Sequence, residues 1–296
     1  MASHPMVKLL EHLARMHPGA SNRTLRQMVE HRRVFVDGVA ATRSDLEIGP
    51  DAKVTVGKKS LPSEDDGVTV LFEDDHLVVI DKPPGLLTVA PRDDGRTSAW
   101  AAVRRRMAPK GADAHLVHRL DEAASGVLVF AKTKEAHDGL KGLFAAHDIE
   151  RLYIAVVDGD VAEAEGRFDA PLVESLFPPY KVAVLRPGAP RDIAERAESA
   201  TTLWKRLAIG RRRSAVLVRL ETGRKHQIRV HFADHGHPIT GDERYGGSTN
   251  SRLLLHAAVL GFKHPITGKD VRVTSRPDVN FRRAFSELPD PVPTTW

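Results

Sequence analysis

A charged loop ahead of a hydrophobic strand is the first place in this sequence where the residue types suggest chemistry. His118, Arg119 and Asp121 lie together in it, and the apolar run 126–131 follows almost directly. A carboxylate in such a loop is held by the rigid strand and can still face a cleft, as catalytic groups often do. The alternative is structural: Asp121 caps a turn and pairs with Arg119, and these residues alone favour that interpretation.

A second polar segment, 222–231, could supply a partner for Asp121. Its alternation predicts a strand from Gln227 to His231, with Arg229 on the same face as both ends. An arginine buried beside a cleft needs a carboxylate partner, and pairing with Asp121 would keep that acid ionised at neutral pH. The alternative is an exposed strand face whose charges meet only water.

Tyr153 is the third candidate, at the start of a strand predicted over 153–157. A tyrosine in that position can stack on a planar ring and present its hydroxyl group. A place in the core or at its rim is the commoner fate of a tyrosine, so the residue type alone does not decide its role.

Several histidines lie close together in one stretch of the chain, which could indicate a metal hydrolase. His231 and His235 stand four residues apart, the spacing of a zinc pair on a helix. Gly236 and Pro238 argue against a helix that carries both, and Phe232 stands where the H-E-x-x-H pattern needs glutamate. We therefore expect no metal site. The chain also lacks cysteine, which excludes disulfides and thiolate-bound metals.

The elements around these residues predict an α+β fold with a mixed sheet rather than a regular series of strand–helix–strand units. Strands are expected over 68–72, 77–80, 126–131, 153–157 and 215–220, and helices over 98–107 and 135–146. Lys82-Pro83-Pro84-Gly85 must form a rigid loop, because paired prolines fit neither a helix interior nor a central strand. The end, 288–296, has three prolines in nine residues and is expected to be an extended tail.

Residues 1–60 read as a separate module. Helical spacing predicts a first helix that ends at Pro18-Gly19, and Ser21 fits the N-cap of a second. Short strands and a hairpin turn are expected at 34–36, 54–56 and Asp37-Gly38. A polar linker at 57–67 follows, so we place one domain over 1–60 and a second over 68–285.

Positive charge concentrates in this module. It holds ten Lys or Arg against six Asp or Glu, whereas the whole chain has a net charge of only +5. A second basic cluster lies between Trp204 and Arg229. Such clusters indicate a polyanionic partner, with nucleic acid first, and a solvated basic face is an equal alternative. The arginines on the predicted helices and the strand entry are Arg15, Arg23, Arg26, Arg32 and Arg33.

The module resembles the S4 RNA-binding domain over roughly 7–57. The resemblance rests on the serine-led second helix and on the strand that ends Val34-Phe35-Val36-Asp37-Gly38. It implies that the five arginines contact RNA. A generic basic helical module is the alternative.

The rest of the chain resembles the RluA class of pseudouridine synthases over roughly 68–275. The motifs occur in the order and spacing of that class. They are Lys82-Pro83-Pro84-Gly85, the HRLD box 118–121, Ser125-Gly126, Tyr153, the box 222–231, the turn 241–246 and Leu255-His256-Ala257. The two boxes together make this resemblance very specific.

The resemblance implies a role for each matching residue. Asp121 matches the catalytic aspartate, Arg229 the arginine paired with it, Tyr153 the tyrosine that stacks on the target base, and Arg119 the arginine that opens the RNA. The adjoining box implies RNA contacts by Arg224, Lys225, His226 and Gln227. Two positions depart from the class, which usually has threonine at Ala124 and lysine at Arg151.

The implied reaction breaks the N1–C1′ bond of a uridine, turns the base and rejoins it through C5. It exchanges no electrons, so no cofactor is expected. RNA is the expected partner, with large-subunit ribosomal RNA favoured and transfer RNA possible; an inactive S4-type RNA-binding protein is the alternative. With no apolar run of about 18 residues and no signal-peptide core, we expect no membrane span and a cytoplasmic monomer.

Overall fold

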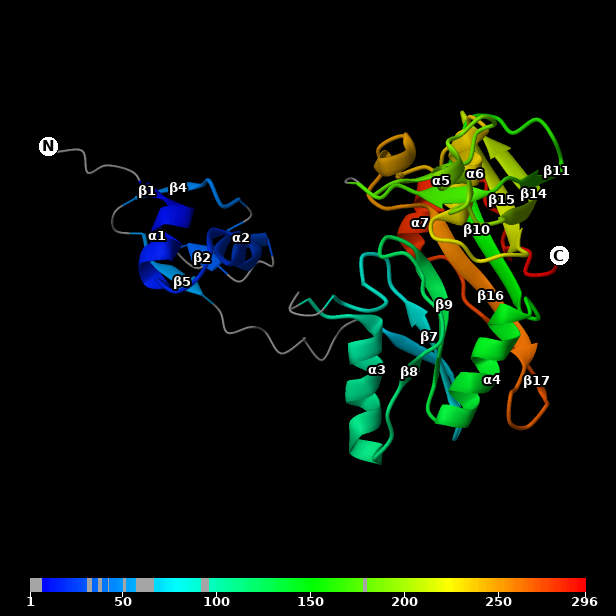
Figure 1. Ribbon diagram of the computed structural model, residues 1–296, viewed down its shortest axis with the longest axis horizontal. Coiled ribbons are helices and arrows are strands. Elements are labelled where there is room, and N and C mark those ends of the chain that lie inside the picture. Colours follow the sequence, from blue (N-terminus) through cyan, green and yellow to red (C-terminus); the bar gives the residue numbers. More distant parts are fainter. Residues whose placement is uncertain are drawn as a thin grey trace, which may run out of the picture. The chain divides into compact units, whose positions relative to one another are not determined.

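The computed structural model of the chain describes residues 7–30, 34–36, 39–41, 43–49, 52–56, 67–91, 96–177 and 180–296. It contains two compact units, one of Met1–Asp66 with Ala90–Thr97 and one of Gly67–Val89 with Ser98–Trp296 (Figure 1). Within these described ranges, no helix combines the length and the hydrophobicity that crossing a bilayer requires. Of the predicted linker 57–67, only Gly67 is described.

The small unit packs two short helices on small sheets. Its elements are β1 (Val7–Lys8), α1 (Leu9–Met16), α2 (Asn22–Glu30), β2 (Val34–Val36), β3 (Val39–Ala40), β4 (Glu47–Ile48) and β5 (Val54–Val56). Leu13 on α1 and Leu25 on α2 are fully buried in its core. The Ser21 hydroxyl accepts a hydrogen bond from the Thr24 amide at 3.2 Å, which confirms the predicted N-cap. The turn predicted at Asp37-Gly38 lies outside the described residues.

A ten-stranded sheet forms the large unit, in the path order β11-β14-β15-β10-β16-β9-β7-β6, with β17 beside β16 and β8 beside β9. Its strands are β6 (Thr69–Glu73), β7 (Leu77–Lys82), β8 (His115–Leu116), β9 (Ser125–Ala131), β10 (Glu150–Asp158), β11 (Glu165–Asp169), β14 (Thr201–Gly210), β15 (Arg213–Leu220), β16 (Leu255–Lys263) and β17 (Asp270–Thr274). The pair β16–β9 is parallel and the others are antiparallel, so the sheet is mixed and the fold is α+β, as predicted. A separate hairpin is formed by β12 (Leu172–Glu174) and β13 (Val182–Val184).

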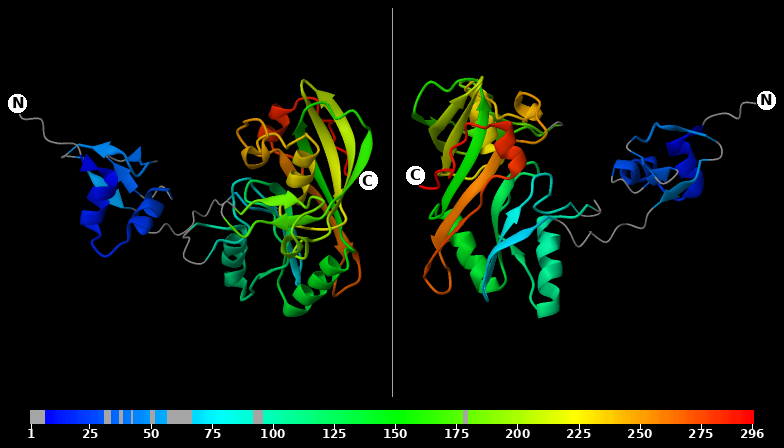
Figure 2. Two further views of the ribbon diagram at one scale, coloured as in Figure 1. Left: turned by 45° about the horizontal axis from the view of Figure 1, so that its top comes forward. Right: turned by 180° about the vertical axis from the view of Figure 1, so that it is seen from behind.

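Helices cover both faces of this sheet. They are α3 (Ala99–Met107), α4 (Lys134–Ala145), α5 (Arg191–Ala194), α6 (Gln227–Asp234) and α7 (Val279–Ala284), with short 3₁₀ turns at Ala108–Lys110 and Glu243–Tyr245. Figure 2 shows α3 and α4 beside the end of the sheet that holds β7 and β9, and α7 beside β10 and β16. The central strands β7, β9, β10 and β16 accordingly bury mostly apolar side chains on both faces.

Alternation along the strands decides which helix each side chain meets. On β7, Leu77 and Val79 pack with α4, whereas Val78 and Ile80 pack with α3. On β10, Leu152, Ile154 and Val156 join the core beside α7, whereas Ala155 and Val157 join the core that α6 covers. Tyr153 shares that second face, because it lies two residues from Ala155.

The predicted strands and helices recur with ends shifted by a few residues, except at 227–231, which is helical. The C-terminal segment has no helix or strand after α7, as expected of an extended tail. However, Leu288 and Val292 are buried in the core beside α7. The large unit therefore includes this segment and extends past the predicted domain boundary at 285.

Candidate active site

Asp121 lies in the loop between β8 and β9, and a buried lysine holds that loop. Lys82, at the end of β7, has no exposed surface. Its ammonium group donates to the carbonyl oxygens of Pro83, Leu86 and Glu122 at 3.0, 2.7 and 3.1 Å. Burial lowers the pKa of Lys82 to about 7. These bonds tie the proline loop to the residue that follows Asp121, a role for Lys82 that the sequence did not reveal.

Two further contacts fix the same loop. The Thr88 hydroxyl donates to the Leu120 carbonyl at 2.7 Å and accepts from the Leu120 amide at 3.1 Å. Gly126 has a φ of +113°, and a Cβ placed there would lie 2.2 Å from the carbonyl oxygen of Ala257 on the neighbouring strand β16. Only glycine allows this approach. The backbone on both sides of Asp121 is therefore anchored to the sheet.

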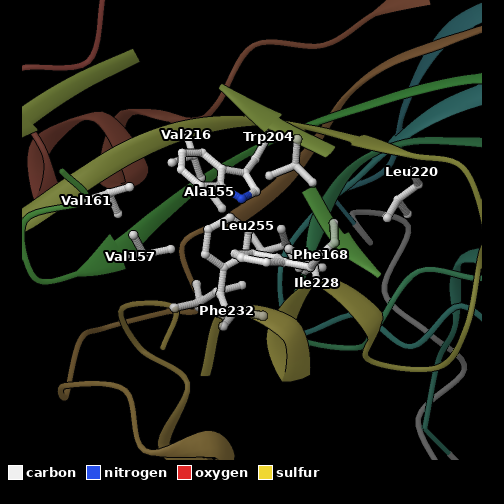
Figure 3. Close-up of a cluster of buried hydrophobic side chains, with 14 residues drawn as sticks. Ala155, Val157, Val161, Phe168, Trp204, Val216, Leu220, Ile228, Phe232 and Leu255 are labelled. Atoms are coloured by element: carbon white, nitrogen blue, oxygen red, sulfur yellow. The ribbon is translucent and has the colours of Figure 1, made fainter. Parts of the chain in front are cut away.

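The strand predicted from Gln227 to His231 is wrong, because these residues begin helix α6. The polar–apolar alternation is also compatible with a helix, in which positions four apart share a face. Ile228 and Phe232 bury that face, and the ring of Phe232 meets the ring of Phe168 edge-on at 5.0 Å (Figure 3). The helix thus sits on the sheet through its apolar residues and presents its polar ones to other partners.

Arg229 on α6 binds two carboxylates. Its Nη1 donates to Asp121 Oδ2 at 2.9 Å, so the predicted pair is confirmed. Its Nε and Nη2 donate to Asp242 at 2.7 and 2.9 Å. The side chains of Arg229, Asp121 and Asp242 are 10, 23 and 1% exposed. Burial lowers the pKa of Arg229, but the hydrogen bonds and charges of the two acids outweigh it and raise the pKa.

His226 and Tyr245 lie beside this group. The His226 Nδ1 and the Tyr245 hydroxyl are 2.8 Å apart, and the His226 Nε2 is 3.9 Å from Asp121 Oδ1. The Arg229 guanidinium stands over the Tyr245 ring at 5.1 Å from its centroid. Burial lowers the pKa of His226, against the opposite effect of Asp121. The imidazole is therefore neutral at neutral pH and can exchange hydrogen bonds with a ligand near Asp121.

Asp242 and Tyr245 were not singled out from the sequence and belong to the turn 241–246 of the motif series. The sequence does hold a signal for more: an acid follows Gly241 in a turn, and the long, cationic Arg229 stands between apolar Ile228 and Val230. A buried arginine with five donors can satisfy more than one carboxylate. Nothing in the sequence, however, gives the distance between the turn and the helix.

Tyr153 reaches the site from β10. Its ring packs against two hydrophobic clusters, one holding Ala124 and the other holding Leu120, so it lies against the loop of Asp121. Burial raises the pKa of Tyr153, and the nearby charge of Asp121 raises it further against the opposing effect of Arg151. The phenol is therefore protonated at neutral pH.

The basic residues predicted to contact RNA have different surroundings. Arg119 is exposed, directly before the residues that hold Asp121. Arg224 forms an ion pair with Glu198 at 2.7 Å, and exposed Lys225 pairs with Glu174. Exposed ion pairs of this kind contribute little to stability, so they can give way to an RNA phosphate.

Gln227 contradicts the expectation of an RNA contact. It is 2% exposed. Its amide nitrogen donates to the Thr201 carbonyl and the Thr202 hydroxyl, both at 2.9 Å. Its amide oxygen accepts from the Thr222 hydroxyl at 2.8 Å and from the Arg224 amide at 3.0 Å. All its hydrogen-bonding capacity is used, and it holds the loop 222–224 against β14.

In the small unit, Arg15 lies on α1, and Arg23 and Arg26 lie on α2; all three are exposed. Arg23 and Arg26 stand three residues apart and so share one face of their helix. Arg32 and Arg33 lie outside the described residues.

Helix α6 carries His231 but ends at Asp234, so His235 lies just outside it as the C-cap residue. Both rings have partners within the protein. The His231 nitrogens contact the Thr202 hydroxyl at 2.8 Å and the Ala170 carbonyl at 3.1 Å, and His235 Nδ1 lies 2.8 Å from the His231 carbonyl. In the part of the chain that the structure describes, no group of three His, Asp or Glu side chains could hold a metal ion.

Comparisons with known proteins bear on the whole of this arrangement. A family model described as RNA pseudouridylate synthase matches residues 76–234. The chain is 38% identical to a ribosomal large subunit pseudouridine synthase D of Zymomonas mobilis, covering 70% of this chain and 68% of that one. It is 34% identical to the synthase D of Xanthomonas campestris, covering 93% and 87%. A dual-specificity RNA pseudouridine synthase RluA of Vibrio parahaemolyticus is 36% identical, covering 69% and 81%.

The fold has solved counterparts as well. The structure of human RNA Pseudouridylate Synthase Domain Containing 4 matches 73% of this chain and 91% of its own, with a TM-score of 0.59 and 23% identity. Human RNA Pseudouridylate Synthase Domain Containing 1 matches with a TM-score of 0.57 and 23% identity, over 72% and 84%. The mixed sheet with helices on both faces is thus the fold of these proteins. The chain belongs to the RNA pseudouridylate synthase family, and it is an RNA pseudouridine synthase.

Proposed function

We propose that this enzyme converts uridines of large-subunit ribosomal RNA to pseudouridine, with Asp121 as its catalytic residue. The observation that carries the proposal is the Asp121–Arg229–Asp242 group, in which the Asp121 carboxylate is 23% exposed and that of Asp242 only 1%. Two bacterial relatives at 34 and 38% identity are named as ribosomal large subunit synthases, and this supports the choice of RNA.

The geometry suits the sugar chemistry. Arg229 holds one oxygen of Asp121 at 2.9 Å, and the other oxygen lies 3.9 Å from His226 without a hydrogen bond to Arg229. The carboxylate would act at the sugar, either as a nucleophile at C1′ or as a base at C2′. Tyr153 would lie against the face of the loosened uracil while the base turns. The target nucleotide must first leave its stack, which costs a few kcal/mol.

Exposed cations would bind the RNA around this site. Arg119 lies two residues before Asp121, and Arg224 and Lys225 directly precede His226, whose neutral ring lies 3.9 Å from Asp121 and would add a hydrogen bond. Arg15, Arg23 and Arg26 add charge on the small unit, with Arg32 and Arg33 near them in sequence. We propose that the small unit is an S4-like RNA-binding domain over 1–60. Its two helices beside small sheets, with exposed Arg15, Arg23 and Arg26 on those helices, support this assignment.

Transfer RNA is the second candidate substrate. One relative at 36% identity is named a dual-specificity RNA pseudouridine synthase, which favours keeping a second RNA class in the test. We further propose that the enzyme is a monomer, because a single chain already holds the residues proposed for catalysis, and that it works in the cytoplasm, as expected of an enzyme that acts on ribosomal RNA. Sedimentation of the purified protein, alone and with RNA, tests the oligomeric state.

The test of function maps pseudouridines in total RNA from cells with and without the gene, by carbodiimide adducts and primer extension. We expect one or a few sites in large-subunit RNA to vanish and to return with the wild-type gene but not with Asp121→Asn. Loss of sites in transfer RNA alone would select the second candidate. Unchanged maps, with no conversion of any transcript by the purified protein, would refute the proposal.

A further inference from the structure

Arg151 is a buried cation that has no carboxylate partner among the residues that the structure describes. The residue is 7% exposed, at the start of β10, two positions before Tyr153 and on the same side of the strand. Its Nη2 makes only long hydrogen bonds, of 3.5 and 3.4 Å, to the carbonyl oxygens of Leu220 and Glu221. Its Nε is buried and has no hydrogen-bond partner among the residues that the structure describes.

Other buried arginines of the large unit are treated differently. Arg229 has two carboxylates, and Arg252 forms an ion pair with Asp278. A buried charge without a carboxylate is costly and is rarely retained unless something else binds it. Burial lowers the pKa of Arg151, and Tyr153 acts weakly against this. The guanidinium is therefore kept in a setting that favours a negatively charged ligand.

The surroundings of Arg151 are those of the active site. A Cβ on Gly223 would lie 2.5 Å from its Nη1, so the absence of a side chain there makes room for the guanidinium. The Arg151 Cζ stands 5.8 Å from the ring centroid of Phe144, and that ring stacks on His118 at 4.6 Å. Gly223 precedes α6 and His118 precedes Asp121, so the cation lies where the two segments that carry the proposed catalytic group approach β10.

We propose that Arg151 donates hydrogen bonds to a carbonyl oxygen of the target uracil and stabilises the base as it leaves the sugar. This rests on the proposed function. When the C1′–N1 bond breaks, its electron pair goes to the base, which becomes a uracil anion with charge on its ring nitrogen and carbonyl oxygens. The guanidinium offsets that charge. An electron pair at C5 of the turned base then forms the new C5–C1′ bond. The proton lost from C5 is balanced by the proton gained at N1.

Burial favours the base over an RNA phosphate as the ligand. A phosphodiester remains at the protein surface, where Arg119 and Lys225 are exposed to receive it. Arg151 lies instead on the side of β10 that carries Tyr153, the residue proposed to lie against the uracil. Charge that appears only during bond breaking is what a fixed donor in a dry site stabilises best.

The first experiment compares Arg151→Met, which keeps length and removes charge, with Arg151→Lys, which keeps charge. The matched control is Arg282→Met on α7, whose partner is exposed Asp290. The substrate is a transcript around the mapped uridine, under single-turnover conditions. We expect Arg151→Met to slow conversion about 100-fold, as removal of one oxyanion donor does. Its RNA Kd should change less than about twofold, and the control should match wild type.

A second arm varies the leaving base. Fluorine at C5 makes uracil more acidic, so 5-fluorouridine RNA needs less help to release its base. The Arg151→Met penalty on cleavage of the C1′–N1 bond should therefore be several-fold smaller with 5-fluorouridine than with uridine. Equal penalties on both bases would overturn the proposal. A raised Kd with a shallower salt dependence and an unchanged rate would instead identify a phosphate contact and also overturn it.

Arg151→Lys guards against a folding defect in the Met variant. Its ammonium group titrates, so its conversion rate should fall at alkaline pH where that of wild type holds, while its melting temperature stays within a few degrees. A low, pH-independent rate combined with a lowered melting temperature would show a structural role only and overturn the proposal. If wild type converts no RNA, the proposed function itself fails, an outcome distinct from all of these.

Discussion

Two carboxylates share one guanidinium, and their exposure separates their roles. The Asp121 side chain is 23% exposed and makes one hydrogen bond to Arg229, whereas Asp242 is 1% exposed and makes two. An exposed acid with a single partner is available for chemistry. A buried acid with both oxygens bonded holds the arginine in place.

Asp121→Asn should therefore abolish isomerisation and leave the fold intact. The substitution keeps size and can keep one hydrogen bond to Arg229, but it removes the charge that the sugar chemistry needs. We expect no pseudouridine above background, as read by carbodiimide adducts of the transcript. The melting temperature should stay within a few degrees of wild type, and the RNA affinity should change little. Substantial turnover by the purified variant would disprove the assignment of Asp121.

Asp242→Ala should act mainly through stability. It leaves Arg229 buried with only the more exposed of its two partners, a loss on the order of 3–5 kcal/mol if the pair behaves as fully buried. Urea unfolding measures this free energy, and Asp121→Ala is the matched control, expected to lose clearly less. Equal losses in the two variants would mean that the arginine does not depend on Asp242.

At the scale of elements, the strands and helices with strong patterns were predictable, and α6 was not. Over the five positions 227–231, the alternation of polar and apolar residues fits the period of a strand as well as that of a helix. Only Phe232, one residue beyond that window, completes the i, i+4 pair with Ile228 that indicates a helix. The Asp121–Arg229 pair was predictable, because an arginine that faces a cleft is stabilised by an acid and the two boxes 118–121 and 222–231 together imply this pair. The contact with Asp242 was not, since it depends on how the turn 241–246 lies against α6. The expected RNA contact of Gln227 was wrong for the same reason. In the helix its amide turns toward β14 and is bonded there.

The junction of β9 and β16 gives a prediction for acid stability. The His256 ring is buried there, with Nδ1 2.9 Å from the Ser125 hydroxyl and Nε2 3.2 Å from the Ser275 carbonyl. Burial lowers the pKa of His256 to about 4, whereas the unfolded residue titrates near 6.5. Between these values the unfolded state binds more protons, so stability falls as pH falls, by roughly 3 kcal/mol over the window.

His256→Asn should therefore show a shallower loss of unfolding free energy between pH 6.5 and pH 4 than wild type. Urea denaturation at four pH values in that window measures the slope for each protein. Exposed His147, replaced by Asn, is the control and should keep the wild-type slope. Parallel slopes for wild type and His256→Asn would show that the histidine does not contribute to acid unfolding.

At the scale of the molecule, the two units have separate cores. One cluster contains only residues of the small unit, and the clusters of the large unit contain only its own side chains, among the described residues. The proposed catalytic residues Asp121, Tyr153 and Arg229 all belong to the large unit. Catalysis and the extra RNA affinity of the basic module should therefore be separable by truncation.

Deletion of residues 1–60 should leave a folded enzyme with weaker RNA binding. It removes ten basic side chains, of which about three or four are expected to touch phosphates, and each contact to single-stranded RNA contributes roughly −0.7 to the slope of log affinity against log salt. The slope should become shallower by about 2 to 3, while turnover at saturating RNA survives. Salt titrations of binding for both proteins, with single-turnover rates, measure this. A full-length chain with Arg15, Arg23 and Arg26 replaced by Ala should show part of the same change. An unchanged slope in the truncated protein would mean that the basic helices are only solvated surface, and the S4-like assignment would fail with it.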